Sequence, residues 1–373
     1  MIHLVNKHTI ILLLLLCCEV LASGQKLSDQ LLADIEDGEL DNFSRIEAAF
    51  LIAANNDSAQ WQQGLMWFHG LVEDVRQKNI IGFDKVPSAE KLFLYLHTTW
   101  LIHYQREATT LFDIMERKAF NCVSATVLYN LLGDEVGLKT EAFETPTHVY
   151  SIFTNIAEQV MVENTNSMGF NIMKNLQRYS EYLRQYYPEN EALKIGLDRL
   201  YAYENSHGRR INNTELLGLI AYNLAIFWAE KKNFEQAYAK LTLAQRFNAD
   251  SRSNQKFEIS LYYRWGQMLF DQRDFLRAFR VMADACYRYP DNNDFRQNCQ
   301  IAFVNALQQL WRDKDWDETE AIIWEMADLN IASKRELELQ LQVLQRWMDY
   351  LRLQQRSEET QRAAMLYQQL NRP

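Results

Sequence analysis

One pattern of residues recurs every 41 positions through the C-terminal half of the chain. In each copy an aromatic residue is followed seven positions later by a large aliphatic one: Phe234 with Leu241, Phe275 with Met282, and Trp316 with Ile323. A fixed spacing of roughly 20–50 residues is typical of stacked supersecondary units. Each such unit buries its apolar face only against its neighbours. The recurrence therefore limits this half of the chain to a linear array of similar units.

Each unit is predicted to be a pair of helices. Small and large residues alternate one helix before the aromatic, at 224–225, 265–266 and 306–307, which lets paired helices pack closely. Residues 214–332, with a degenerate fourth pair at 335–370, resemble tetratricopeptide repeats, although the period exceeds the usual ~34 residues by about seven. The resemblance implies a surface that binds a protein partner. Generic helical hairpins are the alternative, and the constant spacing weighs against them.

The overall composition favours a globular, mainly helical protein. Hydrophobic residues make up 48% of the 373 residues, and the chain holds only 12 glycines and 5 prolines, which argues against a disordered chain. The formal net charge is −10. Because an acidic surface repels a phosphate backbone, we expect no nucleic-acid partner.

The N-terminus has the pattern of a secretory signal peptide. An apolar run at 9–18 precedes small residues at 22–24, which predicts a signal peptide over 1–24. The run is shorter than the roughly 20 residues of a spanning helix, so we expect no membrane span after signal removal. An uncleaved anchor, or a lipid on Cys17 or Cys18, is the alternative. We therefore expect an exported protein, either periplasmic or extracellular.

Three cysteines remain once 1–24 is removed, namely Cys122, Cys286 and Cys299. An odd number in an exported chain suggests one pair and one free thiol. Cys286 and Cys299 flank the turn around Asn292 at almost equal distances, so a disulfide between the two flanking helices is geometrically possible. Two separate buried thiols are the other interpretation, and the sequence leaves both open.

The block before the repeats is predicted to combine helices with a small sheet. Helical periodicity runs through 27–78, and the apolar stretch 92–104 predicts a long helix that begins near Pro87 and Ser88. A further apolar helix is expected at 123–132, where Asn121 is a good N-cap candidate. Three short strands then follow, at Lys139–Glu144, His148–Thr154 and Gln159–Glu163.

Three residues of this block fit the chemistry of thiol acyl transfer. That chemistry needs a thiolate, an imidazole that takes and returns a proton, and a polar group that orients the imidazole. Cys122 opens a helix, where the helix terminus stabilises a thiolate. His148 begins a strand after a Thr-Pro-Thr turn, and Glu163 ends the neighbouring strand. Taken singly, each residue is more typical of a core or surface position; taken together they predict a site.

The same block resembles bacterial transglutaminase-like proteins of the papain-type fold. The stretches that carry the resemblance are 120–125 around the cysteine, 128–129, 145–150 around the histidine, and 162–165 around the glutamate. The resemblance covers about 90 residues. It implies Cys122 as nucleophile, His148 as general base and acid, and Glu163 as the orienting group. The family more often has Asp in the third position.

No cofactor or metal is expected. The remaining histidines lack the paired spacing of zinc ligands, and neither a Cys-x-x-Cys motif nor a glycine-rich phosphate loop occurs. The catalytic chemistry is therefore expected to come from the side chains alone.

These inferences combine into an α+β chain with two functional parts. We expect a signal peptide at 1–24, then helices plus a transglutaminase-like core (a cysteine helix and an antiparallel sheet) at 25–180, and tetratricopeptide-like repeats at 181–373. The first hypothesis is an exported cysteine amidase, protease or acyl transferase acting on peptide or protein amide bonds, with the repeats binding a protein partner. The alternative is a non-catalytic repeat scaffold that carries an inactive transglutaminase-like domain.

Overall fold

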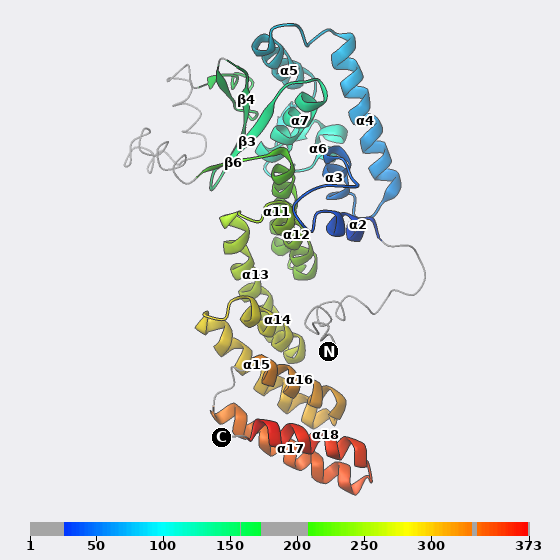
Figure 1. Ribbon diagram of the computed structural model, residues 1–373, viewed down its shortest axis with the longest axis vertical. Helices are drawn as coiled ribbons and strands as arrows, with labels where there is room; N and C mark the ends of the chain where they lie inside the picture. Colours follow the sequence, from blue (N-terminus) through cyan, green and yellow to red (C-terminus); the bar gives the residue numbers. More distant parts are fainter. Residues whose placement is uncertain (1–25, 157, 173–207, 330–333, 372–373) are drawn as a thin grey trace, which may run out of the picture. The chain divides into compact units, whose positions relative to one another are not determined.

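The computed structural model describes residues 26–156, 158–172, 208–329 and 334–371 (Figure 1). It is 67% helical with a small antiparallel sheet, in keeping with the expected α+β class. The chain divides into two compact units. The first extends to Leu224 and includes Lys240–Asp250, and the second comprises Ala225–Ala239 and the chain from Ser251 onward.

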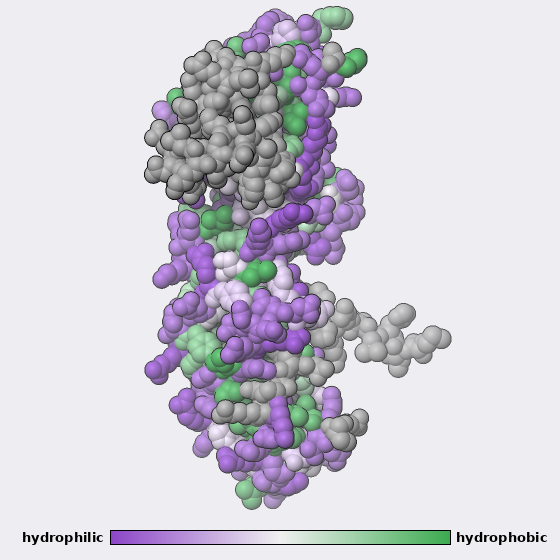
Figure 2. Space-filling model, turned by 90° about the vertical axis from the view of Figure 1, so that its left-hand side faces the viewer, coloured by the Kyte–Doolittle hydropathy of each residue, from purple (hydrophilic) through white to green (hydrophobic). Residues whose placement is uncertain are grey.

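Two of the expected boundaries lie outside the described residues. They are the signal peptide at 1–24 and the domain boundary between residues 180 and 181. Among the residues that the structure describes, no helix is both long enough and apolar enough to cross a bilayer. On the face shown in Figure 2, hydrophilic residues predominate and hydrophobic ones lie in small separate groups.

Among the described residues, six helices precede the main sheet: α2 (Leu27–Asp34), α3 (Arg45–Leu51), α4 (Ser58–Gln77), α5 (Lys85–Thr99), α6 (Leu111–Arg117) and α7 (Cys122–Glu135). From α3 to α7, each helix start has a side-chain cap. Asp57 accepts hydrogen bonds from the amides of the first turn of α4, and Asp84 caps α5. Since Asp84 supplies this cap, α5 begins at Lys85, slightly before the predicted start near Pro87.

The predicted helix over 92–104 is wrong at its C-terminal end. Helix α5 stops at Thr99, and the following residues form the short strand β1 (His103–Tyr104). This strand pairs in parallel with β2 (Ala119–Phe120), and the amides of Ile102 and His103 donate to the carbonyl of Lys118. Pairing with a distant segment therefore overrides the helical spacing of the apolar side chains.

The main sheet contains β3 (Thr140–Glu144), β4 (Val149–Thr154), β5 (Gln159–Val162) and β6 (Arg209–Ile211). The strand order is β5-β4-β3-β6, and all neighbours are antiparallel. The first three strands match the predicted ones to within one residue at each end. Strand β6 was not predicted, and it covers the outer edge of β3.

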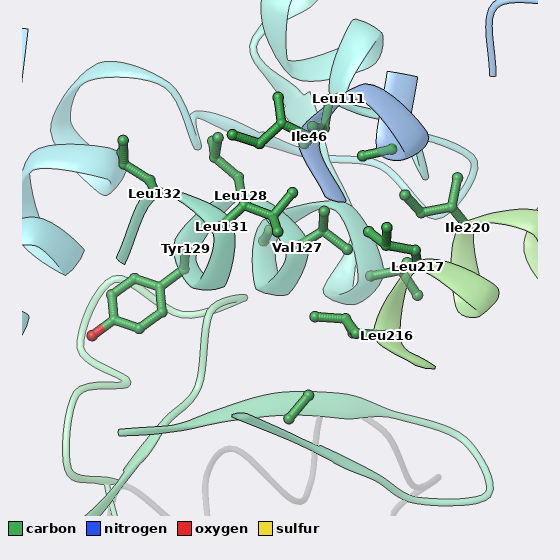
Figure 3. Packing of buried hydrophobic residues seen from close by; sticks show 14 of the residues in the cluster. Ile46, Leu111, Val127, Leu128, Tyr129, Leu131, Leu132, Leu216, Leu217 and Ile220 are labelled. Carbon is green, nitrogen blue, oxygen red and sulfur yellow. The ribbon is translucent and has the colours of Figure 1, made fainter. Parts of the chain in front are cut away.

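Helix α7 lies at the centre of the first unit's core. Figure 3 shows Val127 and Leu128 of α7 among apolar side chains from α3, α6 and the start of α11, with a sheet strand beneath. Helix α7 continues beyond the predicted end at residue 132, and Gly133 lies within its last turn. A Cβ on Gly133 would lie 3.3 Å from the Thr140 side chain, so glycine lets β3 approach the helix closely.

The repeat half consists of α11 (Asn213–Glu230), α12 (Phe234–Phe247), α13 (Arg252–Asp271), α14 (Phe275–Arg288), α15 (Asn293–Asp313), α16 (Trp316–Leu329), α17 (Lys334–Leu353) and α18 (Ser357–Leu370). The second helix of each pair starts 41 residues after the previous one, at Phe234, Phe275, Trp316 and Ser357. Two positions before each start lies a residue with left-handed backbone, φ 58–59°: Lys232, Arg273, Lys314 and Gln355. The same left-handed backbone conformation thus recurs every 41 residues, in the fourth helix pair as in the first three.

Cys286 of α14 and Cys299 of α15 are both buried and both free. Their side chains are hydrogen-bond partners. The two residues are therefore neighbouring free thiols, which agrees with the alternative of two buried thiols without a bridge.

Candidate functional site

Cys122 is the first residue of α7. The Asn121 side chain accepts hydrogen bonds from the amides of Val123 (2.9 Å) and Ser124 (3.1 Å). In return, the Ser124 hydroxyl accepts from the Asn121 amide at 3.0 Å and so completes a capping box. The cap fixes the helix start and leaves the partly exposed Cys122 thiol in the first turn of α7.

The loop between β1 and α6 is tied to the same helix start. The Asn121 amide group donates to the carbonyl of Arg106 at 2.9 Å, and the Ser124 hydroxyl donates to the carbonyl of Ala108 at 2.7 Å. These two buried or partly buried bonds hold the 105–108 backbone beside the cysteine.

His148 comes directly before β4, which lies between β5 and β3 in the sheet. The turn before it is closed by two bonds: the His148 amide donates to the Thr145 hydroxyl at 3.1 Å, and the Thr145 amide donates to the His148 carbonyl at 2.8 Å. The turn therefore holds a buried imidazole directly before the first residue of β4.

Glu163 follows β5 and is fully buried. One carboxylate oxygen, Oε2, lies 2.8 Å from His148 Nε2, and the other accepts from the Thr165 amide at 2.9 Å. The Glu163 amide donates to the carbonyl of Gly169 at 3.1 Å. A Cβ on Gly169 would lie 2.1 Å from the Glu163 carbonyl oxygen, so only glycine fits this turn.

The three predicted site residues lie together. Burial lowers the pKa of His148, but the Glu163 carboxylate and the neighbouring Cys122 side chain raise it more strongly, to about 10. The Cys122 thiol is therefore within interaction range of the same ring that Glu163 holds. The arrangement offers a thiol, an imidazole that favours its protonated form, and a carboxylate that compensates the buried positive charge.

Two supporting residues were missed in the sequence. The Asn164 amide group donates to the hydroxyls of Ser151 (2.7 Å) and Thr126 (3.2 Å), and so links the end of β5 to β4 and α7. His97 of α5 packs its ring against Phe93, with 4.4 Å between ring centroids. Burial lowers the pKa of His97 to about 4 although Glu163 and the Asn164 backbone act to raise it. Asn164 could have been found as the neighbour of Glu163, whereas nothing in the sequence pointed to His97.

Tyr104 was also missed, because it was placed on the predicted helix over 92–104. In the structure it lies in β1, opposite Phe120. Burial, together with the neighbouring Cys122 and Glu163, raises the pKa of Tyr104 to about 12. A phenol therefore lies near the thiol and remains protonated at neutral pH.

Across the described residues, no group of three or more His, Cys, Asp or Glu side chains could hold a metal ion. No family model matches the chain, and neither a curated protein nor a solved structure matches it. The resemblance to transglutaminase-like proteins therefore rests on the sequence stretches around Cys122, His148 and Glu163.

Proposed function

We propose that this protein is an exported, transglutaminase-like cysteine hydrolase or acyl transferase that acts on amide bonds of peptides or proteins. The observation that carries the proposal is the buried 2.8 Å contact between His148 Nε2 and Glu163, with the Cys122 thiol within range of the same imidazole. Three residues far apart in sequence meet in the order that thiol acyl transfer requires.

The roles follow from which ring nitrogen is occupied. Glu163 holds Nε2, so Nδ1 is the nitrogen that exchanges a proton with the Cys122 thiol. The thiolate attacks the amide carbonyl, and the imidazolium protonates the leaving amine as the C–N bond breaks. The resulting thioester is cleaved by water in a hydrolase, or by a second amine in an acyl transferase. Whether water or an amine attacks the thioester determines hydrolysis or acyl transfer, and the same three residues can catalyse either reaction.

Glu163 supplies the charge balance for this cycle. A buried imidazolium without a counter-charge would lose its proton. Because the Glu163 carboxylate offsets the burial, His148 remains protonated when the thiol ionises, and the two form a thiolate–imidazolium pair. The Thr165 amide occupies the second carboxylate oxygen, which keeps Glu163 aimed at the ring.

The helical repeats are assigned to partner binding. Four helix pairs with a constant 41-residue period present similar surfaces in series, and arrays of this kind bind extended protein segments. In this reading the repeats select a protein partner and the thiol acts on an amide bond of that partner or of a bound peptide.

The test is alkylation of the full chain with iodoacetamide near neutral pH, followed by peptide mapping of each cysteine. An activated thiol reacts as the thiolate, so we expect Cys122 to be labelled at least about tenfold faster than Cys286 and Cys299. His148→Ala should remove this advantage, because it removes the counter-charge. The matched control is His103→Ala, an exposed histidine in β1.

Two results would contradict the proposal. Cys122 labelling no faster than that of the buried pair, or unchanged labelling in His148→Ala, would leave the non-catalytic repeat scaffold as the better interpretation.

A further inference from the structure

Attack of a thiolate on an amide places a negative charge on the carbonyl oxygen, and this oxyanion needs hydrogen-bond donors. One donor is available at the start of α7. The Val123 and Ser124 amides are bonded to the Asn121 side chain, whereas the Cys122 amide has no acceptor among the described residues. Substrate bound at Cys122 can therefore reach one backbone N–H, and a second donor has to come from elsewhere.

Tyr104 is held close to this point by the β1–β2 pair. In that pair Tyr104 lies opposite Phe120, which is two positions before Cys122. The Gln105 amide donates to the Phe120 carbonyl at 2.8 Å. The Tyr104 and Phe120 rings meet edge to face, with 5.8 Å between centroids. Strand register and ring packing together fix the phenol beside the segment that leads into the cysteine.

The Tyr104 hydroxyl is free to bind a substrate. Its side chain is half-exposed, at 50%, and none of the side-chain hydrogen bonds of the described residues involves its oxygen. It interacts electrostatically with both Cys122 and Glu163, and burial together with these two groups raises its pKa to about 12. The hydroxyl therefore keeps its proton over the working range of a thiol enzyme and can act as a donor.

We propose that the Tyr104 hydroxyl and the Cys122 amide together donate hydrogen bonds to the oxyanion formed when the Cys122 sulfur attacks a carbonyl. This inference rests on the proposed function. As the C–S bond forms, the carbonyl π pair moves to oxygen, and both donors strengthen their bonds to it. When the tetrahedral intermediate collapses, the leaving group departs with a proton from His148, and the carbonyl reforms as a thioester. Tyr104 gives up no proton in this step.

The experiment compares two reactions of the full-length protein and of Tyr104→Phe. Acylation by p-nitrophenyl acetate passes through an oxyanion, whereas alkylation by iodoacetamide does not. Loss of one oxyanion donor costs roughly 10²-fold in kcat. We therefore expect the acylation kcat of Tyr104→Phe to fall by about this factor with KM nearly unchanged, while the rate of Cys122 alkylation stays at the wild-type value.

The control is Tyr287→Phe, which removes the hydroxyl of an exposed tyrosine in the second unit and should leave both rates unchanged. Phenylalanine keeps the ring that packs on Phe120, and circular dichroism of Tyr104→Phe checks that the fold is retained.

Three outcomes would overturn the assignment of Tyr104. Wild-type acylation rates in Tyr104→Phe would exclude a role for the hydroxyl. Equal losses of acylation and alkylation would make Tyr104 a positioning residue for the thiol. A wild-type protein whose Cys122 alkylates no faster than the buried cysteines would overturn the proposed function itself, and the role of Tyr104 with it.

Discussion

Glu163 is the residue whose burial most restricts the chemistry of the site. A fully buried carboxylate is costly unless it is paired and hydrogen-bonded. Glu163 meets both conditions, through His148 at 2.8 Å and the Thr165 amide at 2.9 Å. The pKa of His148 is raised to about 10, against the opposing effect of burial. The contribution of this pair to stability is therefore fully present below the ordinary histidine pKa of about 6.5, and it is lost as pH rises through about 10.

Replacing Glu163 with Gln should bring the pKa of His148 down towards or below its ordinary value, because the buried imidazolium loses its counter-charge. Breaking a buried pair costs roughly 3 kcal/mol, so we expect a loss of about this size near pH 6 that becomes smaller towards pH 10. Urea denaturation over this pH range, together with NMR titration of the His148 ring, measures both effects.

The matched control for this change is Glu141→Gln, which neutralises an exposed carboxylate on β3 that pairs with Arg210. It should change stability by less than about 1 kcal/mol at any pH. A Glu163→Gln variant whose loss of stability grows with rising pH would contradict the assigned direction of the His148 pKa.

Some residues of the site could be predicted because neighbouring residues in the sequence mark them. Others could not, because their positions depend on contacts with segments far away in the sequence. Cys122 follows an N-cap residue, His148 follows a proline turn, and Glu163 ends a β-rich run, so each is marked by its neighbours in sequence. His97 and Tyr104 carry no such mark. Tyr104 belongs to a two-residue strand that exists only because residues 118–120 provide its partner.

At the scale of secondary structure, the turn inside each helix pair is the most regular feature of the repeats. A residue with φ 58–59° ends the first helix in all four pairs, and none of the four is glycine. In three pairs the next residue caps the second helix by accepting from an amide three positions on: Asn233, Asp274 and Asp315. In the fourth pair Arg356 makes no such bond. This lost cap is a physical reason why the fourth pair appeared degenerate in the sequence, although its turn and spacing are intact.

Lys314 offers a test of these turns. Its left-handed backbone suits glycine better than a residue with a Cβ, so Lys314→Gly should stabilise the repeats by about 0.5–1 kcal/mol. The control is Asp313→Gly, one position earlier in the helical backbone of α15, which should destabilise by about 0.5–1 kcal/mol. Denaturant midpoints of the two variants should move in opposite directions, and a shared direction would contradict the role of the turn.

At the scale of the whole molecule, the division into two compact units predicts more than one unfolding transition. Gly169→Ala inserts a methyl group where a Cβ would lie 2.1 Å from the Glu163 carbonyl oxygen, so it should lower only the transition of the first unit. Lys314→Gly should raise only the other transition. Scanning calorimetry of the two variants assigns each transition, and a single transition that responds to both changes would contradict the division.

Gly70→Ala is the control for the glycine change. Gly70 lies in α4, and a Cβ there would meet nothing within 4 Å. Removing a glycine from an exposed helix interior stabilises by roughly 1 kcal/mol. Gly70→Ala should therefore raise the same transition that Gly169→Ala lowers.

The identical turn in each helix pair also has a consequence for how such a chain changes in evolution. A duplication or deletion of 41 residues between Lys314 and Gln355 rejoins the chain at an equivalent left-handed residue, with the next helix beginning two positions later. Unequal recombination can therefore add or remove a repeat while the joined helices keep the same turn between them. The number of repeats is then a quantity that selection can adjust while the residues around Cys122 stay as they are.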